Sequence, residues 1–184
     1  MNASEEQERE SSEWNVRELS AGEFDALSAA SEYGGFQQTS EMAALAQSEG
    51  MQTQYVGLVD SHDVPVAGAL VAFSQGRFGV EGSLWLGPLC NGNDGEQMTA
   101  LTDGLREVAE RVHAISLTCW PNQVYCVRDS QGKVMAEPND EMVREYERLG
   151  WKHAGFARGY GALMNRWNYV KDLREFSNAG ELLA

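Results

Sequence analysis

One apolar stripe, followed directly by an apolar strand, constrains the fold of this chain more than any other feature of the sequence. Its members are separated by three or four residues, the spacing of one face of an α-helix: Met98, Leu101, Leu105, Val108 and Val112. Residues 114–119, AISLTC, then form a compact apolar run of strand character that ends near Pro121. Since an amphipathic helix buries its apolar face against a neighbouring layer, the pattern predicts a layered domain of helices and strands.

Three further helices are predicted from capping signals. Ser20 and Glu23 have the spacing of a capping box, in which the serine hydroxyl accepts from a free backbone N–H and the glutamate reaches back to the cap. A second helix is expected over residues 40–49, because apolar side chains recur there at helical spacing and Gly50 suits a left-handed stop. Another is expected to begin after Asn139.

The middle of the chain has strand character. Residues 54–59 and 64–73 are rich in Val and Leu and flank a short turn, which predicts a hairpin. Residues 83–89, SLWLGPL, are predicted as a further strand, and residues 153–157 and 167–173 as additional β structure. Strands and helices alternate without the regular rhythm of a doubly wound sheet. The predicted fold class is therefore α/β (α+β), with a mixed sheet flanked by helices.

The chain is strongly acidic, with 28 Asp and Glu residues against 14 Lys and Arg and a formal net charge of −14. Residues 1–13 hold five glutamates and one arginine, with no large apolar side chain after Met1, so a disordered acidic tail is predicted there. The length of 184 residues suits one domain, to which we assign residues 14–184. Binding to DNA or to anionic lipid is not expected, because phosphate contacts require a face rich in Lys and Arg.

The cysteines and histidines indicate neither a metal site nor a disulfide framework. Cys90, Cys119 and Cys126 are odd in number and lack C-x-x-C spacing, and the three histidines are isolated from one another and from the cysteines. No cofactor is predicted. No apolar run approaches the ~20 residues of a membrane span, and the acidic, polar start does not resemble a signal peptide, so a cytoplasmic location is expected.

The loop over residues 91–95 lies between a predicted strand and a predicted helix, where backbone N–H groups can cradle a pyrophosphate, as in acetyltransferases that bind coenzyme A. Its glycine spacing is not that of such loops, and Asp94 and Glu96 place negative charge where phosphate would lie. A plain connection is therefore the better interpretation. The carboxylates at residues 137–141 are likewise explained by the helix dipole rather than by acid–base catalysis.

Several short stretches, in one order, carry a family resemblance. Residues 33–43, YGGFQQTSEMA, resemble the segment Y-G-N-F-F-Q-T-P-E-W-A, and residues 86–88, LGP, resemble an R-G-P strand end. Residues 121–125, PNQVY, and 128–132, RDSQG, resemble the runs P-N-V-x-Y and R-D-x-x-G, and residues 149–156, LGWKHAGF, and 166–167, RW, close the set. Over about residues 23–184 the sequence resembles the Fem-type (FemABX) aminoacyltransferases, which form the bridges of peptidoglycan.

The resemblance implies an acetyltransferase-like (GNAT-type) fold and the transfer of an amino acid from aminoacyl-tRNA to the stem-peptide amine of a peptidoglycan precursor. It also implies a second subdomain, in the same protein or in another chain, because family members carry two and this sequence matches the first. Gln38, Tyr125 and Arg128 match the family motifs and are the candidate substrate-binding residues, and each of them also suits a structural role.

Two positions depart from the family pattern where polar chemistry is expected. The family strand L-R-x-D-P is LTCWP here, so that Thr118 stands in place of the Arg and Trp120 in place of the Asp. An indole neither accepts a proton nor holds a cation by charge, and no catalytic residue is assigned. Three functions therefore remain open: a truncated or partial Fem-type aminoacyltransferase, a non-catalytic binding or scaffold relative, and a coenzyme A-dependent N-acetyltransferase.

Overall fold

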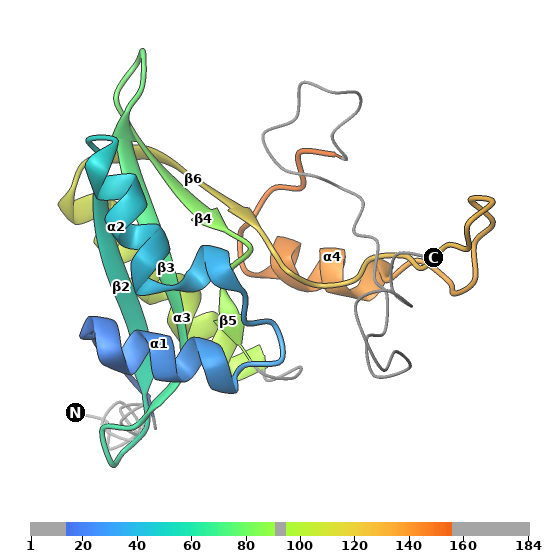
Figure 1. The fold of residues 1–184 in the computed structure, drawn as a ribbon, viewed down its shortest axis with the longest axis horizontal. Helices are drawn as coiled ribbons and strands as arrows, with labels where there is room; N and C mark the ends of the chain where they lie inside the picture. The colour runs from blue at the N-terminus through green and yellow to red at the C-terminus, as the bar shows by residue number, and fades with distance from the viewer. Residues whose placement is uncertain (1–13, 91–94, 156–184) are drawn as a thin grey trace, which may run out of the picture. The chain divides into compact units, whose positions relative to one another are not determined.

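The computed structural model describes residues 14–90 and 95–155 of the chain (Figure 1). Their helices and strands follow one another in this order: β1 Asn15–Glu18, α1 Ala21–Ala30, the 3₁₀ turn η1 Phe36–Gln38, α2 Ser40–Ser48, β2 Gln52–Val59, β3 Pro65–Gln75, β4 Val80–Trp85, β5 Leu89–Cys90, α3 Gly95–Arg111, β6 Ala114–Trp120 and α4 Asp140–Arg148. All of these elements belong to one unit that ends at Lys152. The assignment of residues 14–184 to a single domain stays a prediction.

The six strands form one mixed sheet in the order β1-β2-β3-β4-β6, with β5 paired to β3 beside the end of β4. β1 to β5 pair antiparallel, whereas β4 and β6 are parallel. A parallel pair needs a long crossover, and the chain supplies it through α3. The predicted mixed sheet flanked by helices is thereby confirmed.

Helices cover both faces of this sheet, as Figure 1 shows for α1 and α2 in front of β2 and β3 and for α3 behind them. The predicted stripe of α3 packs with alternate side chains of β2 and β3, among them Val56, Leu58 and Val71. Phe24 and Leu27 of α1 form a separate cluster with Leu70 on the opposite face. The spacing of three and four residues in the sequence thus identified the buried face of α3.

The structure confirms the helix starts that the capping signals predict. The Ser20 hydroxyl accepts from the backbone N–H of Glu23, and the Glu23 carboxylate accepts from the backbone N–H of Ser20, so both halves of the predicted capping box are present. Asn139 caps α4 by accepting from the backbone N–H of Met142. Gly50 and Gly150 follow α2 and α4 with positive φ angles of 86° and 89°.

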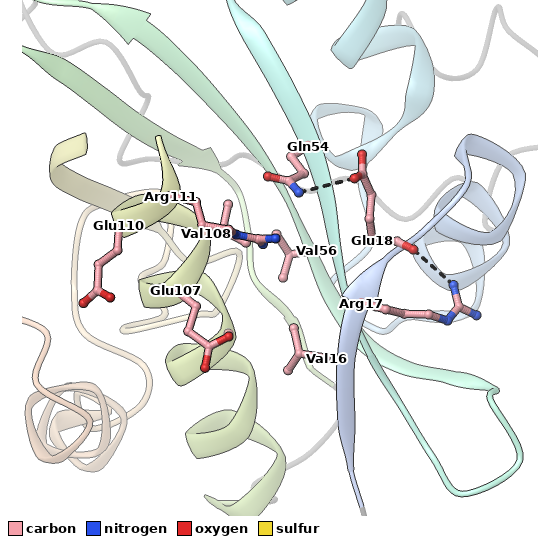
Figure 2. Close-up of a pocket in the computed structure, with 10 residues that line it drawn as sticks. Val16, Arg17, Glu18, Gln54, Val56, Glu107, Val108, Glu110 and Arg111 are labelled. Carbon is pink, nitrogen blue, oxygen red and sulfur yellow. Dashed lines mark hydrogen bonds between the residues drawn. The ribbon is translucent and has the colours of Figure 1, made fainter. Parts of the chain in front are cut away.

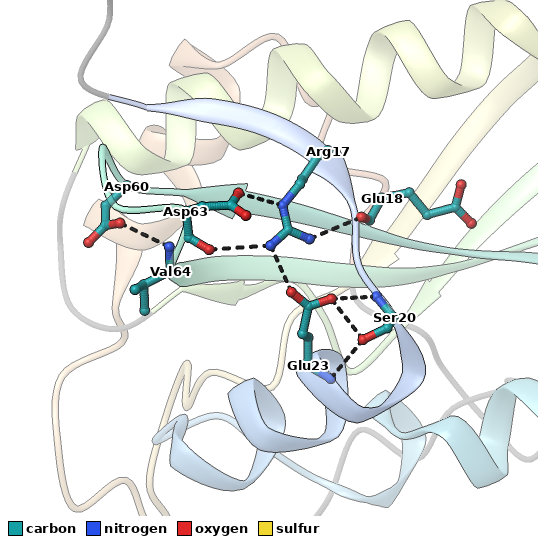
Figure 3. Close-up of polar contacts among 7 residues, drawn as sticks. All are labelled: Arg17, Glu18, Ser20, Glu23, Asp60, Asp63 and Val64. Carbon is teal, nitrogen blue, oxygen red and sulfur yellow. Dashed lines mark hydrogen bonds and ion pairs between the residues drawn. The ribbon is translucent and has the colours of Figure 1, made fainter.

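Strand β1 was not predicted, and a polar network explains how it is held. Figure 3 shows the Arg17 guanidinium donating to Glu23 at the start of α1 and to Asp63 in the turn between β2 and β3. The nitrogen–oxygen distance is 2.7 Å in both ion pairs. One side chain therefore ties the edge strand to a helix and to a hairpin. Asp63 is 46 residues from Arg17, which is why the short polar stretch NVRE gave no strand signal.

The prediction of a continuous strand over residues 83–89 was wrong. β4 ends at Trp85, Leu86 adopts a φ of 52°, and the chain resumes pairing at β5. Residues 153–155 have no regular structure. The remaining predictions for residues 156–157 and 167–173, the acidic tail over residues 1–13 and most of the loop over residues 91–95 lie outside the described residues. No helix among the described residues is long and apolar enough to cross a bilayer.

Candidate functional site

The break between β4 and β5 creates an irregularity on the edge of β3. β4 pairs with β3 as far as Ser83 opposite Ala72, and pairing resumes with Leu89 opposite Gly68. Five residues, 84–88, therefore lie opposite three, 69–71, which makes a bulge with two extra residues. Bulges of this kind redirect the chain and occur often beside functional sites.

The side chain of Gln38 fills the gap that the bulge leaves in the hydrogen-bond ladder. Its Nε2 donates to the carbonyl oxygen of Trp85 at 2.8 Å, and its Oε1 accepts from the backbone N–H of Leu70 at 2.9 Å. The side chain is fully buried, at 0 % exposure. A Cβ atom on Gly87 would lie 2.8 Å from the Gln38 amide, so the glycine leaves the space that this amide occupies. The amide thus takes the place of a peptide unit between two separated strands.

The bulge lies where the two parallel strands of the sheet end together. Trp85 of β4 is opposite Trp120 of β6, and both strands stop at this pair. Just beyond it, the Asn122 side chain donates to the carbonyl oxygen of Tyr33 at 3.1 Å. Segments 33–38, 85–88 and 120–122 are thereby tied together. We call this region the strand-end site, because ligands of open α/β sheets bind beyond the carboxyl ends of parallel strands.

The polar groups near the strand-end site can donate and accept hydrogen bonds. The Oε1 atom of Gln123 is buried and has no hydrogen-bond partner among the described residues, which leaves an acceptor to be satisfied. Thr118 is exposed and Trp120 is half-buried.

Burial raises the pKa of the Cys119 thiol to about 12, so this cysteine stays protonated at neutral pH and is a poor nucleophile. Within residues 14–90 and 95–155, no cluster of His, Cys, Asp and Glu could hold a metal ion.

Tyr125 and Arg128 each form a hydrogen bond away from the bulge. The Tyr125 hydroxyl donates to Asp140 at the start of α4 at 2.7 Å, and this hydrogen bond raises the pKa of the tyrosine. The Arg128 guanidinium donates to the carbonyl oxygen of Gly132 at 2.8 Å, inside the turn over residues 129–132. The hydrogen bonds of Gln38, Tyr125 and Arg128 described above reach different parts of the fold. Their assignment to substrate binding stays a prediction, and of the three, Gln38 borders the strand-end site.

Sequence reasoning missed the bulge and the contact between Asn122 and Tyr33. A signal for the bulge was available, because Gly87 and Pro88 interrupt an otherwise apolar strand, and proline in the interior of a sheet is confined to edges and bulges. The contact between Asn122 and Tyr33 joins residues 89 positions apart and had no such signal.

Comparison with known structures gives the class of the fold first. The crystal structure of a probable acetyltransferase matches 83 % of this chain and 99 % of its own, with a TM-score of 0.52 and 10 % identity. The crystal structure of FemX matches 79 % of this chain with a TM-score of 0.64 and 18 % identity. At these identities the likeness concerns the fold, which is that of the acetyltransferases. This chain covers 34 % of the FemX chain, so it spans about a third of that relative.

The family follows from the sequence itself. The model of the FemAB family matches residues 19–184, and the chain belongs to that family. Among curated proteins, none matches the chain. The resemblance inferred from the short motifs is therefore confirmed at the level of family and fold.

Proposed function

We propose that this chain is one acetyltransferase-like unit of a Fem-type aminoacyltransferase and that its strand-end site binds the acceptor peptide. In the proposed reaction, the stem-peptide amine of a peptidoglycan precursor attacks the ester carbonyl of an aminoacyl-tRNA. An amide bond forms, the ester bond breaks, the tRNA hydroxyl leaves, and the amine gives up one proton. The donor would place this reaction in the cytoplasm.

The observation that carries the proposal is the FemAB match over residues 19–184, combined with a strand-end site on the acetyltransferase-type sheet. The described side chains around that site supply amide, hydroxyl and indole groups, and the thiol of Cys119 is held in its protonated form. None of these is a base at neutral pH. The proton of the attacking amine would therefore pass to a group outside these described side chains, in a second unit or elsewhere in this chain, to the substrate or to solvent.

Binding and transfer can be measured separately. The full chain is titrated with the peptidoglycan precursor in a thermal-shift assay, and the expected result is a rise in melting temperature, because a ligand of the folded state stabilises it. Asn122→Ala, which removes the hydrogen bond to Tyr33, is expected to reduce that rise, whereas the exposed Gln75→Ala is expected to leave it unchanged. No rise at millimolar precursor would contradict the proposal.

Transfer is tested by mass spectrometry of the precursor after incubation with the chain and aminoacyl-tRNA. We expect no added amino acid with this chain alone and an added amino acid when a second Fem-type unit is supplied. Efficient transfer by the chain alone would show that the second unit is unnecessary.

Two alternatives have observations in their favour. A non-catalytic binding relative is favoured by Thr118 and Trp120, which stand where the family pattern has charged residues. It would bind the precursor but transfer nothing even with a second unit. A coenzyme A-dependent N-acetyltransferase is favoured by the fold match that covers 99 % of a probable acetyltransferase and 83 % of this chain. In that case acetyl-coenzyme A, rather than the precursor, would raise the melting temperature.

A further inference from the structure

A groove of about 550 Å³ lies between α3 and the edge of the sheet formed by β1 and β2 (Figure 2). β1 and β6 are at opposite ends of the strand order, so this groove is on the other edge of the sheet from the strand-end site. We call it the β1–α3 groove. Six side chains matter for what it could bind: Val16, Glu18, Val56, Glu107, Val108 and Glu110.

The β1–α3 groove rests on the hydrophobic core, which fixes it in place. Val56 of β2 and Val108 of α3 are 1 % and 2 % exposed and belong to the main core cluster. Gly104 lets β1 approach the helix, because a Cβ atom there would lie 2.5 Å from Cγ1 of Val16. The groove therefore has walls of regular structure and does not depend on a loop.

The rim of the groove is acidic. Figure 2 shows Glu107 and Glu110 projecting from α3 and Glu18 on β1, where it accepts from Gln54. Among the described residues, none of these three carboxylates forms an ion pair. Of the two basic side chains that line the groove, Arg17 is engaged by Glu23 and Asp63, which leaves Arg111 against three carboxylates.

A length of strand edge is open beside this rim. β1 pairs with β2 only as far as Glu18 opposite Val56, whereas β2 begins at Gln52. Leu19 donates to the carbonyl oxygen of Tyr55, so this carbonyl points toward the β1 side. Backbone groups of a strand alternate in direction, and those of Thr53 therefore point to the same side, past the end of β1. Within residues 14–90 and 95–155, no strand pairs with them.

We propose that the β1–α3 groove binds an extended, basic peptide segment of a partner protein, which adds to the open edge of β2. Strand addition would supply the main-chain hydrogen bonds, the exposed Val16 would contact an apolar side chain, and Glu18, Glu107 and Glu110 would face Lys or Arg. Charge argues against other occupants. Residues 1–13 carry five glutamates and one arginine, a second copy brings a net charge of −14, and nucleic acid is also anionic. This proposal is independent of the acyl-transfer function.

The test uses the full chain and two synthetic seven-residue peptides of alternating sequence, one with Lys and the other with Glu at the same positions, and Thr or Val between. We expect the Lys peptide to bind in isothermal titration calorimetry, with an affinity that falls as salt is added. We also expect it to slow amide hydrogen exchange at Thr53. Binding of the Lys peptide without a change at Thr53, or equal binding of the Glu peptide, would overturn the proposal.

Matched variants test the role of the rim. Glu107→Gln with Glu110→Gln is expected to weaken the Lys peptide roughly fivefold, since exposed ion pairs are individually weak. Glu81→Gln with Glu147→Gln makes the same change in net charge on exposed residues outside the groove and is expected to leave the affinity within about twofold. Equal weakening by both pairs would mean general attraction to an acidic protein and would overturn the site. Amide exchange at Thr53 that slows as the protein concentration rises, in the absence of peptide, would also overturn the proposal, because a second copy would then occupy the edge.

Discussion

The buried amide of Gln38 joins two strands that the backbone alone would leave apart. It satisfies the N–H of Leu70 and the carbonyl of Trp85, which lie 32 and 47 residues away in the sequence. The Gln38 amide suits these two backbone partners, because an amide side chain carries the same donor and acceptor as a peptide unit. The geometry of the bulge, and with it the strand-end site, therefore depends on one side chain.

Gln38→Met is predicted to destabilise the chain by about 3 kcal/mol, because the buried N–H of Leu70 and the partly buried carbonyl of Trp85 would both lose their partner to a side chain of similar volume. The free energy of unfolding, measured with urea, checks this. The matched control is Gln75→Met, whose exposed amide donates to the carbonyl oxygen of neighbouring Gly76, and it should change stability by less than about 0.5 kcal/mol. Equal effects of the two substitutions would contradict the role assigned to Gln38.

The ion pairs of Arg17 lead to a second prediction, that the stability of the fold depends on pH. The hydrogen bond from Arg17, followed by those from Ser20, lowers the pKa of Glu23 from its ordinary value of 4.5 to about 2. A carboxyl group whose pKa is lower in the folded state stabilises the fold above its unfolded pKa and loses that contribution as pH falls toward the folded pKa. The stability difference between the native chain and Glu23→Gln should therefore be full at pH 6 and shrink between about pH 4.5 and pH 2. A difference that stays constant over this window would count against the network.

At the scale of elements, local signals predicted most of the fold. The caps at Ser20 and Asn139 and the stripe of α3 each lie within a few residues of the structure that they specify, so they could be read directly. β1 could not be predicted from local signals, because it depends on the contact of Arg17 with Asp63, 46 residues away. The strand-end site was foreseen in part. Gln38 was identified from a motif, but its burial and its two backbone partners follow from tertiary packing.

A prediction at this scale compares two helical glycines, of which Gly104 lies at the contact between β1 and α3 and Gly22 does not. Gly104→Ala places a Cβ atom against Val16 and is predicted to destabilise the chain by about 1–2 kcal/mol, since β1 would have to move away from α3. Gly22 of α1 has nothing within 4 Å of the corresponding position. Gly22→Ala is therefore predicted to stabilise the chain by roughly 0.5 kcal/mol through helix propensity alone. Thermal unfolding of both variants measures the two signs, and the same sign for both would refute the steric argument.

At the scale of the whole molecule, the excess of negative charge decides how stability responds to salt. The chain carries twice as many acidic as basic groups, 28 against 14, so repulsion within the folded state opposes compaction at low ionic strength. Salt shortens the screening length from about 10 Å at 0.1 M to about 3 Å at 1 M, which weakens this repulsion more than it weakens the short contacts of Arg17. The melting temperature is therefore predicted to rise as sodium chloride increases from 0.05 M to 1 M. Glu49→Gln with Glu147→Gln, which removes two negative charges, should raise the melting temperature at low salt and reduce the gain from added salt. A melting temperature that falls with salt would show instead that attractive ion pairs outweigh the net charge.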